Sequence, residues 1–97
     1  MISQSHYPNL DSLIRGYFNE DFDLWGNTVA EVLCCFKEEN DPVIHTLVAT
    51  EIERFKRNHS ANLDKSFEKI YGLYVDPEPW GHSTVSFLEE LKRLLRE

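Results

Sequence analysis

The sequence predicts an all-α protein, a single small bundle of about five helices. Apolar residues recur at helical spacing in five separate stretches, and no stretch alternates with period two for long enough to predict a strand. Of the 97 residues, 41% are hydrophobic and 28% are charged, with only four glycines and four prolines. That is enough apolar material for one small core and too much for a disordered chain. We therefore expect one helical domain over residues 1–97.

The first predicted helix begins at Pro8 and Asn9, where a first-turn proline and a capping side chain are expected. Gly16 weakens this helix by about 1 kcal/mol relative to alanine and is compatible with close packing. The acidic and aromatic segment 19–26 is predicted to connect it to the second helix. Its apolar residues form one stripe: Leu10, Leu13, Ile14, Tyr17 and Phe18.

The second predicted helix starts with a capping box formed by Thr28 and Glu31. It ends near residues 38–40, because the Asp-Pro pair at 41–42 supplies a cap and a first-turn proline for the third helix. The third helix extends to about Asn58. The apolar residues of the two helices are Val29, Val32, Leu33 and Phe36, then Ile44, Leu47, Val48, Ile52 and Phe55.

A shorter fourth helix is predicted to start at a Ser60 or Asn62 cap and to end at Gly72. Prolines 77 and 79 exclude a helix from residues 73–82, which form the longest predicted loop. Ser83 is expected to cap the fifth helix. The apolar residues of these two helices are Leu63, Phe67, Ile70 and Tyr71, then Phe87, Leu88, Leu91, Leu94 and Leu95.

The overall charge narrows the possible partners. Seventeen acids against ten bases give a net charge of −7, which disfavours nucleic acid and anionic lipid and favours a basic protein. No apolar run approaches the roughly 20 residues of a membrane span, and the amino-terminal segment lacks the features of a signal peptide. Cys34 and Cys35 are adjacent, so we expect free thiols in a reducing compartment, one of them on the buried side of its helix. These features predict a cytoplasmic protein.

No motif predicts catalysis, a cofactor or a metal site. The four histidines are scattered without zinc-ligand spacing, and neither a phosphate-binding glycine loop nor a nucleophile elbow is present. His45 lies one position from the apolar stripe of its helix and is expected to be packed or half-exposed. We therefore predict a protein that is not an enzyme, with a small enzyme built on carboxylates and histidine as an alternative.

The negative charge is concentrated in the first half of the sequence. Residues 1–53 carry a net charge of −8, whereas residues 54–97 carry +1. Glu38 and Glu39 fall at the end of a predicted helix, where each negative charge costs roughly 0.3–1 kcal/mol. A local rule broken without a structural gain indicates a candidate functional site, and the alternative is that these are ordinary solvated turn acids.

An up-and-down bundle would bring these acids close to the long loop, because the connections after the second and fourth helices would share one end. The acids of 19–26 would lie near the basic run 54–57 at the other end. We therefore predict a protein-binding patch with an acidic rim and aromatic anchors. Its residues are Glu38, Glu39, Asp41, Tyr74, Asp76, Glu78 and Trp80. Trp80 has a second interpretation as a core plug held by the two prolines, and Trp25 is expected to pack on the core.

Residues 7–36 resemble the immunity proteins of bacterial contact-dependent growth inhibition systems, the CdiI family. The resemblance rests on an ordered set of residues: Tyr7-Pro8, Leu10, Leu13, Tyr17-Phe18, Asp21, Gly26, Thr28 and Glu31. It implies an all-helical cytoplasmic protein that binds the toxic C-terminal domain of such a toxin in a 1:1 complex and blocks it. The toxins of these systems are commonly nucleases with basic active sites, which an acidic inhibitor would suit.

The residues that carry this resemblance are interpreted as scaffold and not as the binding site. The alternative to an immunity protein is an acidic helical regulatory or adaptor subunit that binds another basic protein. Neither interpretation requires a cofactor.

Overall fold

The computed structural model describes residues 7–18, 24, 26–72, 75 and 81–97. Five α-helices and no strand occur among these residues, so the predicted all-α class is confirmed. The helices are α1 (Pro8–Tyr17), α2 (Val29–Glu39), α3 (Pro42–Asn58), α4 (Leu63–Tyr71) and α5 (Thr84–Arg96). All five lie where periodicity, prolines and capping residues predict them.

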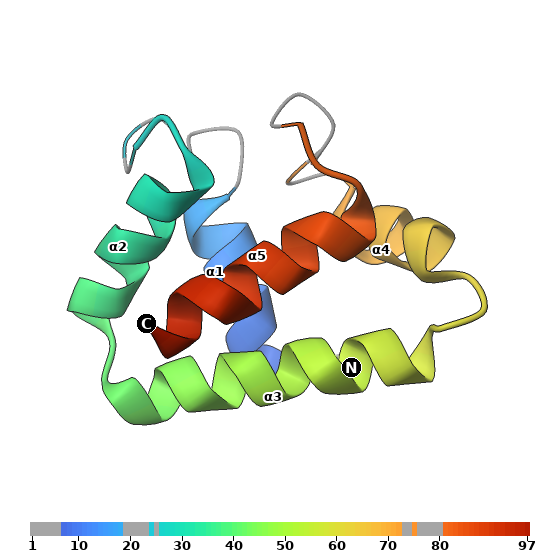
Figure 1. The fold of residues 1–97 in the computed structure, drawn as a ribbon, viewed down its shortest axis with the longest axis horizontal. Coiled ribbons are helices and arrows are strands. Elements are labelled where there is room, and N and C mark those ends of the chain that lie inside the picture. Colours follow the sequence, from blue (N-terminus) through green and yellow to red (C-terminus); the bar gives the residue numbers. More distant parts are fainter. Residues whose placement is uncertain (1–6, 19–23, 25, 73–74, 76–80) are drawn as a thin grey trace, which may run out of the picture.

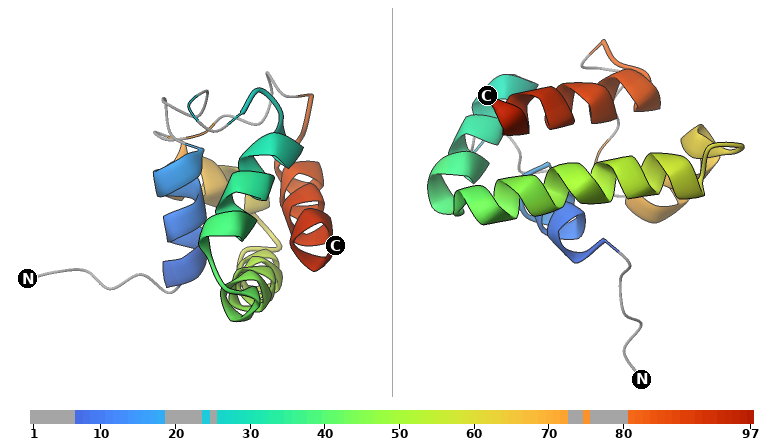
Figure 2. Two further views of the ribbon diagram at one scale, coloured as in Figure 1. Left: turned by 90° about the vertical axis from the view of Figure 1, so that its left-hand side faces the viewer. Right: turned by 60° about the horizontal axis from the view of Figure 1, so that its bottom comes forward.

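The helices do not alternate up and down. The longest helix, α3, runs along one side of the molecule with α5 beside it, and α1 and α2 stand across it (Figure 1). In the view along α3, α1 and α2 are seen from the side (Figure 2, left). The predicted alternation is therefore wrong, because it assumed that every helix lies parallel or antiparallel to the next.

The core lies between all five helices and is rich in aromatic rings. The Phe87 ring packs edge-on against Phe18 and Phe67, with centroids 5.3 and 6.0 Å apart. Most residues of the predicted apolar stripes are buried there, and Leu47 is the one that is exposed, at 41%. The partly buried members are Tyr17, Ile44, Leu63, Ile70 and Leu94. The buried face of α3 is centred on Val48, Ile52 and Phe55, and Leu47 falls outside that arc.

The start of α2 differs slightly from the predicted capping box. The Thr28 hydroxyl oxygen accepts a hydrogen bond from the Glu31 amide at 3.1 Å, as predicted. The Glu31 carboxylate, however, accepts from the Asn27 amide at 2.7 Å, one residue earlier than expected. Gly26 is required here, because an added Cβ would lie 2.4 Å from the Cβ of Glu31.

The start of α1 is capped from another helix. Asn9 is not the cap, since it lies inside the first turn and its side-chain amide donates to Glu51 at 2.7 Å. The backbone amides of Asn9 and Leu10 donate to the same carboxylate at 2.9 Å each. Glu51 belongs to α3 and is only 5% exposed, so a buried carboxylate satisfies the free amides at the positive end of α1.

The predictions for two helix caps, for Gly16 and for the cysteines are confirmed only in part. Ser83 caps α5 in a capping box with Ser86, as a serine cap predicts. Asp41 stands at the cap position of α3, but its side chain makes no capping hydrogen bond. Gly16 is exposed, and an added Cβ would meet nothing within 4 Å, so it does not serve close packing. Both cysteines are free as predicted, but Cys34 is exposed and its neighbour is half-buried, so neither is a core residue.

Candidate protein-binding surface

Three acidic side chains project from the connection between α2 and α3, and we call Glu38, Glu39 and Asp41 the acidic corner. All three are exposed. Glu38 accepts a hydrogen bond from the Cys34 thiol at 3.5 Å, which raises the pKa of that thiol. Glu39 accepts from the Tyr17 hydroxyl of α1, and burial together with this carboxylate raises the pKa of Tyr17 to about 12.

No lysine or arginine pairs with the acidic corner within the described part of the chain. The ion pairs found there join α3 to α5 or lie along α5: Lys56–Glu89, Lys92–Glu53, Lys92–Glu89, Arg93–Glu90 and Arg93–Glu97. Lys37 is the only base between Arg15 and Arg54 in the sequence, and its ammonium group is engaged elsewhere. It donates to the carbonyl oxygens of Leu94 and Glu97 at 2.9 and 2.8 Å.

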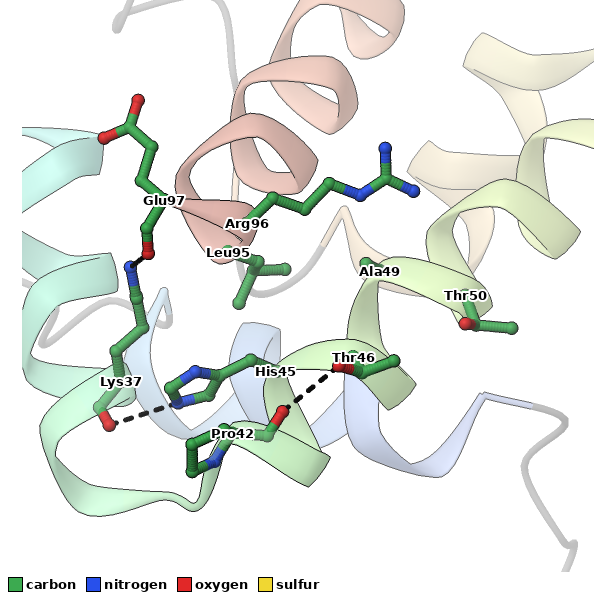
Figure 3. A pocket seen from close by; sticks show the side chains of 9 residues that line it. All are labelled: Lys37, Pro42, His45, Thr46, Ala49, Thr50, Leu95, Arg96 and Glu97. Carbon is green, nitrogen blue, oxygen red and sulfur yellow. Dashed lines mark hydrogen bonds between the residues drawn. The ribbon is translucent and has the colours of Figure 1, made fainter.

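A pocket of about 520 Å³ opens beside the acidic corner, between α3 and the carboxyl end of α5 (Figure 3). The Nε2 atom of His45 lies 3.1 Å from the Lys37 carbonyl oxygen and 2.9 Å from that of Asn40. This contact fixes the α2–α3 turn and confirms the prediction of a packed, half-exposed histidine. The pocket is lined by Lys37, Pro42, His45, Thr46, Ala49, Thr50, Leu95, Arg96 and Glu97.

The solvent-exposed side of α3 continues from the acidic corner as an uncharged surface. No Asp, Glu, Lys or Arg occurs between Asp41 and Glu51 in the sequence. We call the exposed residues of this stretch the outer face of α3: Val43, Thr46, Leu47 and Thr50. Val43 is 67% exposed, and sequence reasoning overlooked it although it falls outside the apolar stripe of α3.

The other predicted patch residues, Tyr74, Asp76, Glu78 and Trp80, lie outside the described residues. Their predicted proximity to the acidic corner therefore stays a prediction. The corner lies beside the carboxyl end of α5, at Leu95 and Glu97.

The predicted balance between the acids of 19–26 and the basic run 54–57 stays a prediction. The guanidinium of Arg54 lies over the Tyr7 ring, 5.2 Å from its centroid, at the amino end of α1. Glu20, Asp21, Asp23 and Trp25 themselves lie outside the described residues.

Neither a metal-binding cluster nor a membrane-spanning helix occurs among the described residues. No group of three or more His, Cys, Asp or Glu side chains there is placed to hold a metal ion. None of the five helices is both long and apolar enough to span a membrane.

Comparison with known proteins identifies the family. No curated protein and no solved structure matches the chain. A family model described as CdiI immunity protein matches residues 6–95, which extends the resemblance seen in residues 7–36 to nearly the whole sequence. The chain therefore belongs to the CdiI immunity protein family.

Proposed function

We propose that this protein binds the toxic C-terminal domain of a cognate contact-dependent growth inhibition toxin in a 1:1 complex, and that this domain is a basic nuclease. Membership of the family supports an immunity function against such a toxin. The observation that supports a basic partner is the acidic corner, three exposed carboxylates without a lysine or arginine partner among the described residues. The protein acts in the cytoplasm by stoichiometric binding, not by catalysis.

The acidic corner contributes to this function in two ways. Its uncompensated charge attracts a basic surface over about 10 Å at 0.1 M salt, which raises the association rate. Once bound, carboxylates occupy the positions that a phosphate backbone would take in a nuclease cleft. Because a nuclease holds its substrate with lysine and arginine side chains, an inhibitor that presents acids to them competes with the substrate.

We also propose that Tyr74, Asp76, Glu78 and Trp80 contact the toxin together with the acidic corner. The alternative role for Trp80, a core plug, predicts a different outcome for Trp80→Ala. If Trp80 contacts the toxin, the Trp80→Ala protein binds the toxin more weakly and keeps its stability. If Trp80 is a core residue, the substitution lowers the free energy of unfolding by about 3–5 kcal/mol.

The test is co-expression with the C-terminal domain of the toxin encoded next to this protein, with growth rescue and co-purification as readouts. We expect both, and failure of both with an active toxin domain would contradict the immunity function and favour an adaptor that binds another basic protein. The variant Glu38→Lys/Asp41→Lys then tests the corner. It leaves Glu39 bonded to Tyr17.

The matched control is Asp64→Lys/Glu68→Lys, which changes the net charge equally at exposed acids of α4. We expect the association rate constant at low salt to fall at least tenfold for the corner variant and much less for the control. Equal effects of the two variants would show that only the net charge matters.

A further inference from the structure

We propose that the outer face of α3 is the apolar centre of the interface with the toxin domain, and that the acidic corner is its charged rim. This inference rests on the proposed function and assigns to it the surface that supplies affinity. Stable protein interfaces place a few apolar anchors in the centre and polar groups around them.

The two apolar side chains of this face stand next to each other. Val43 and Leu47 are four residues apart in α3, so they lie on the same side of the helix one turn from each other. They are 67% and 41% exposed. The other large exposed hydrophobic residues of the described chain, Leu24 and Val85, lie on separate elements and form no such pair with them.

An uncharged surface links this pair to the pocket beside α5. Thr46 and Thr50 line the pocket and are also the neighbours of Val43 and Leu47 at the next turn of the helix. The Thr46 hydroxyl already donates to the Pro42 carbonyl at 3.2 Å, so it does not need a partner from another molecule (Figure 3). Buried Ala49 and Leu95 are among the pocket's lining residues. An apolar side chain of the partner can therefore contact the part of the pocket formed by Ala49 and Leu95, while the charged residues Lys37, Arg96 and Glu97 line the rest of it.

The charges at the two ends of this surface specify the partner. Glu38 and Asp41 stand before the first turn of α3, and Arg54 and Arg57 are exposed in its last turns. A partner that presents a basic cleft beside an apolar projection fits in one orientation, with its cleft over the acidic corner, because the reverse orientation opposes like charges. A second copy of this chain is disfavoured, since each copy carries a net charge of −7.

The experiment compares two double variants in binding to the toxin domain. Val43→Gln/Leu47→Gln removes the apolar pair, and Leu24→Gln/Val85→Gln removes one exposed leucine and one exposed valine elsewhere. We expect Val43→Gln/Leu47→Gln to raise the Kd at least tenfold, mainly through faster dissociation. The control should change the Kd less than threefold. The decrease of the association rate with salt should stay as in the unchanged protein, in contrast to the acidic-corner variant.

Thermal unfolding followed by circular dichroism checks that each variant is folded, and Val43→Gln alone serves if the double variant is not. An unchanged Kd for a folded Val43 variant would overturn this inference while the immunity function stands. A complete absence of binding by the unchanged protein would instead overturn the proposed function. Self-association of the free protein that Val43→Gln/Leu47→Gln abolishes, with toxin affinity retained, would assign this face to a second copy and also overturn the inference.

Discussion

The carboxylate of Glu51 accepts hydrogen bonds from both nitrogens of Asn9, at 2.9 Å from the backbone and 2.7 Å from the side chain. This contact joins the middle of α3 to the first turn of α1 in a buried environment. A charged acceptor there also interacts favourably with the dipole of α1.

The substitution Glu51→Gln should therefore destabilise the protein. A glutamine oxygen can still accept from the two backbone amides, but its NH₂ group faces the side-chain amide of Asn9 and the charge that favours the positive end of α1 is lost, which together cost about 1–3 kcal/mol. Urea unfolding measures the loss. The matched control is Glu53→Gln, two residues along the same helix, where the partly exposed ion pair with Lys92 contributes at most about 1 kcal/mol. Equal losses for the two variants would contradict the capping role.

Replacement of two glycines by alanine should change the free energy of unfolding in opposite directions. Gly26→Ala places a Cβ 2.4 Å from the Cβ of Glu31, and we expect it to lower the free energy of unfolding by about 1–3 kcal/mol. The Cβ of Gly16→Ala meets no atom within 4 Å in the last turn of α1, so this variant should raise stability by at most about 0.5–1 kcal/mol. Parallel urea titrations of the two variants test both signs, and a stabilising Gly26→Ala would show that Glu31 can move away.

The Tyr17 hydroxyl should lose its proton at a higher pH than an ordinary tyrosine. Burial and the Glu39 carboxylate raise the pKa of Tyr17 to about 12, above its ordinary value of 10. The stabilising contribution of the protonated phenol is therefore complete below pH 10 and is lost as the pH rises from 10 towards 12. The difference in near-ultraviolet absorbance between the unchanged protein and Tyr17→Phe isolates this step. Glu39→Gln should move it to lower pH, and an unmoved step would exclude Glu39 as a cause.

The association rate with the toxin should depend strongly on salt. The Debye length falls from about 30 Å at 0.01 M to about 10 Å at 0.1 M, so attraction by exposed carboxylates weakens over this range. Stopped-flow mixing at several salt concentrations measures the slope. A slope for Glu38→Lys/Asp41→Lys equal to that of the unchanged protein would place the attraction elsewhere on the molecule.

The number and positions of the helices could be predicted because their signals are local. Pro8, Thr28 and Ser83 mark helix starts within one turn of the residues they affect. The capping of α1 by Glu51 could not be predicted, because it depends on two helices meeting that are far apart in the sequence. The crossing of α3 against α1 and α2 is set by packing for the same reason, which is why the predicted alternation is wrong.

The candidate surface was predicted in part. The acidic corner was found because Glu38 and Glu39 oppose the dipole of α2, a rule that needs only the sequence. Val43 and Leu47 were not, since Leu47 was assigned to the apolar stripe of α3 and Val43 was left out of it without being considered as an exposed apolar residue. The angular position of Val43, opposite the buried face of α3, is the signal that sequence reasoning could have used.

The contacts made by Glu51 and Lys37 have a consequence for the order of folding. Glu51 is separated from Asn9 by 42 residues, and Lys37 is separated from Leu94 by 57. The first turn of α1 and the last turn of α5 therefore gain their partners only after distant parts of the chain have come together, at the entropic cost of closing long loops. We expect slower folding than in a helical protein held by local contacts, with the terminal helices completed late on the folding path.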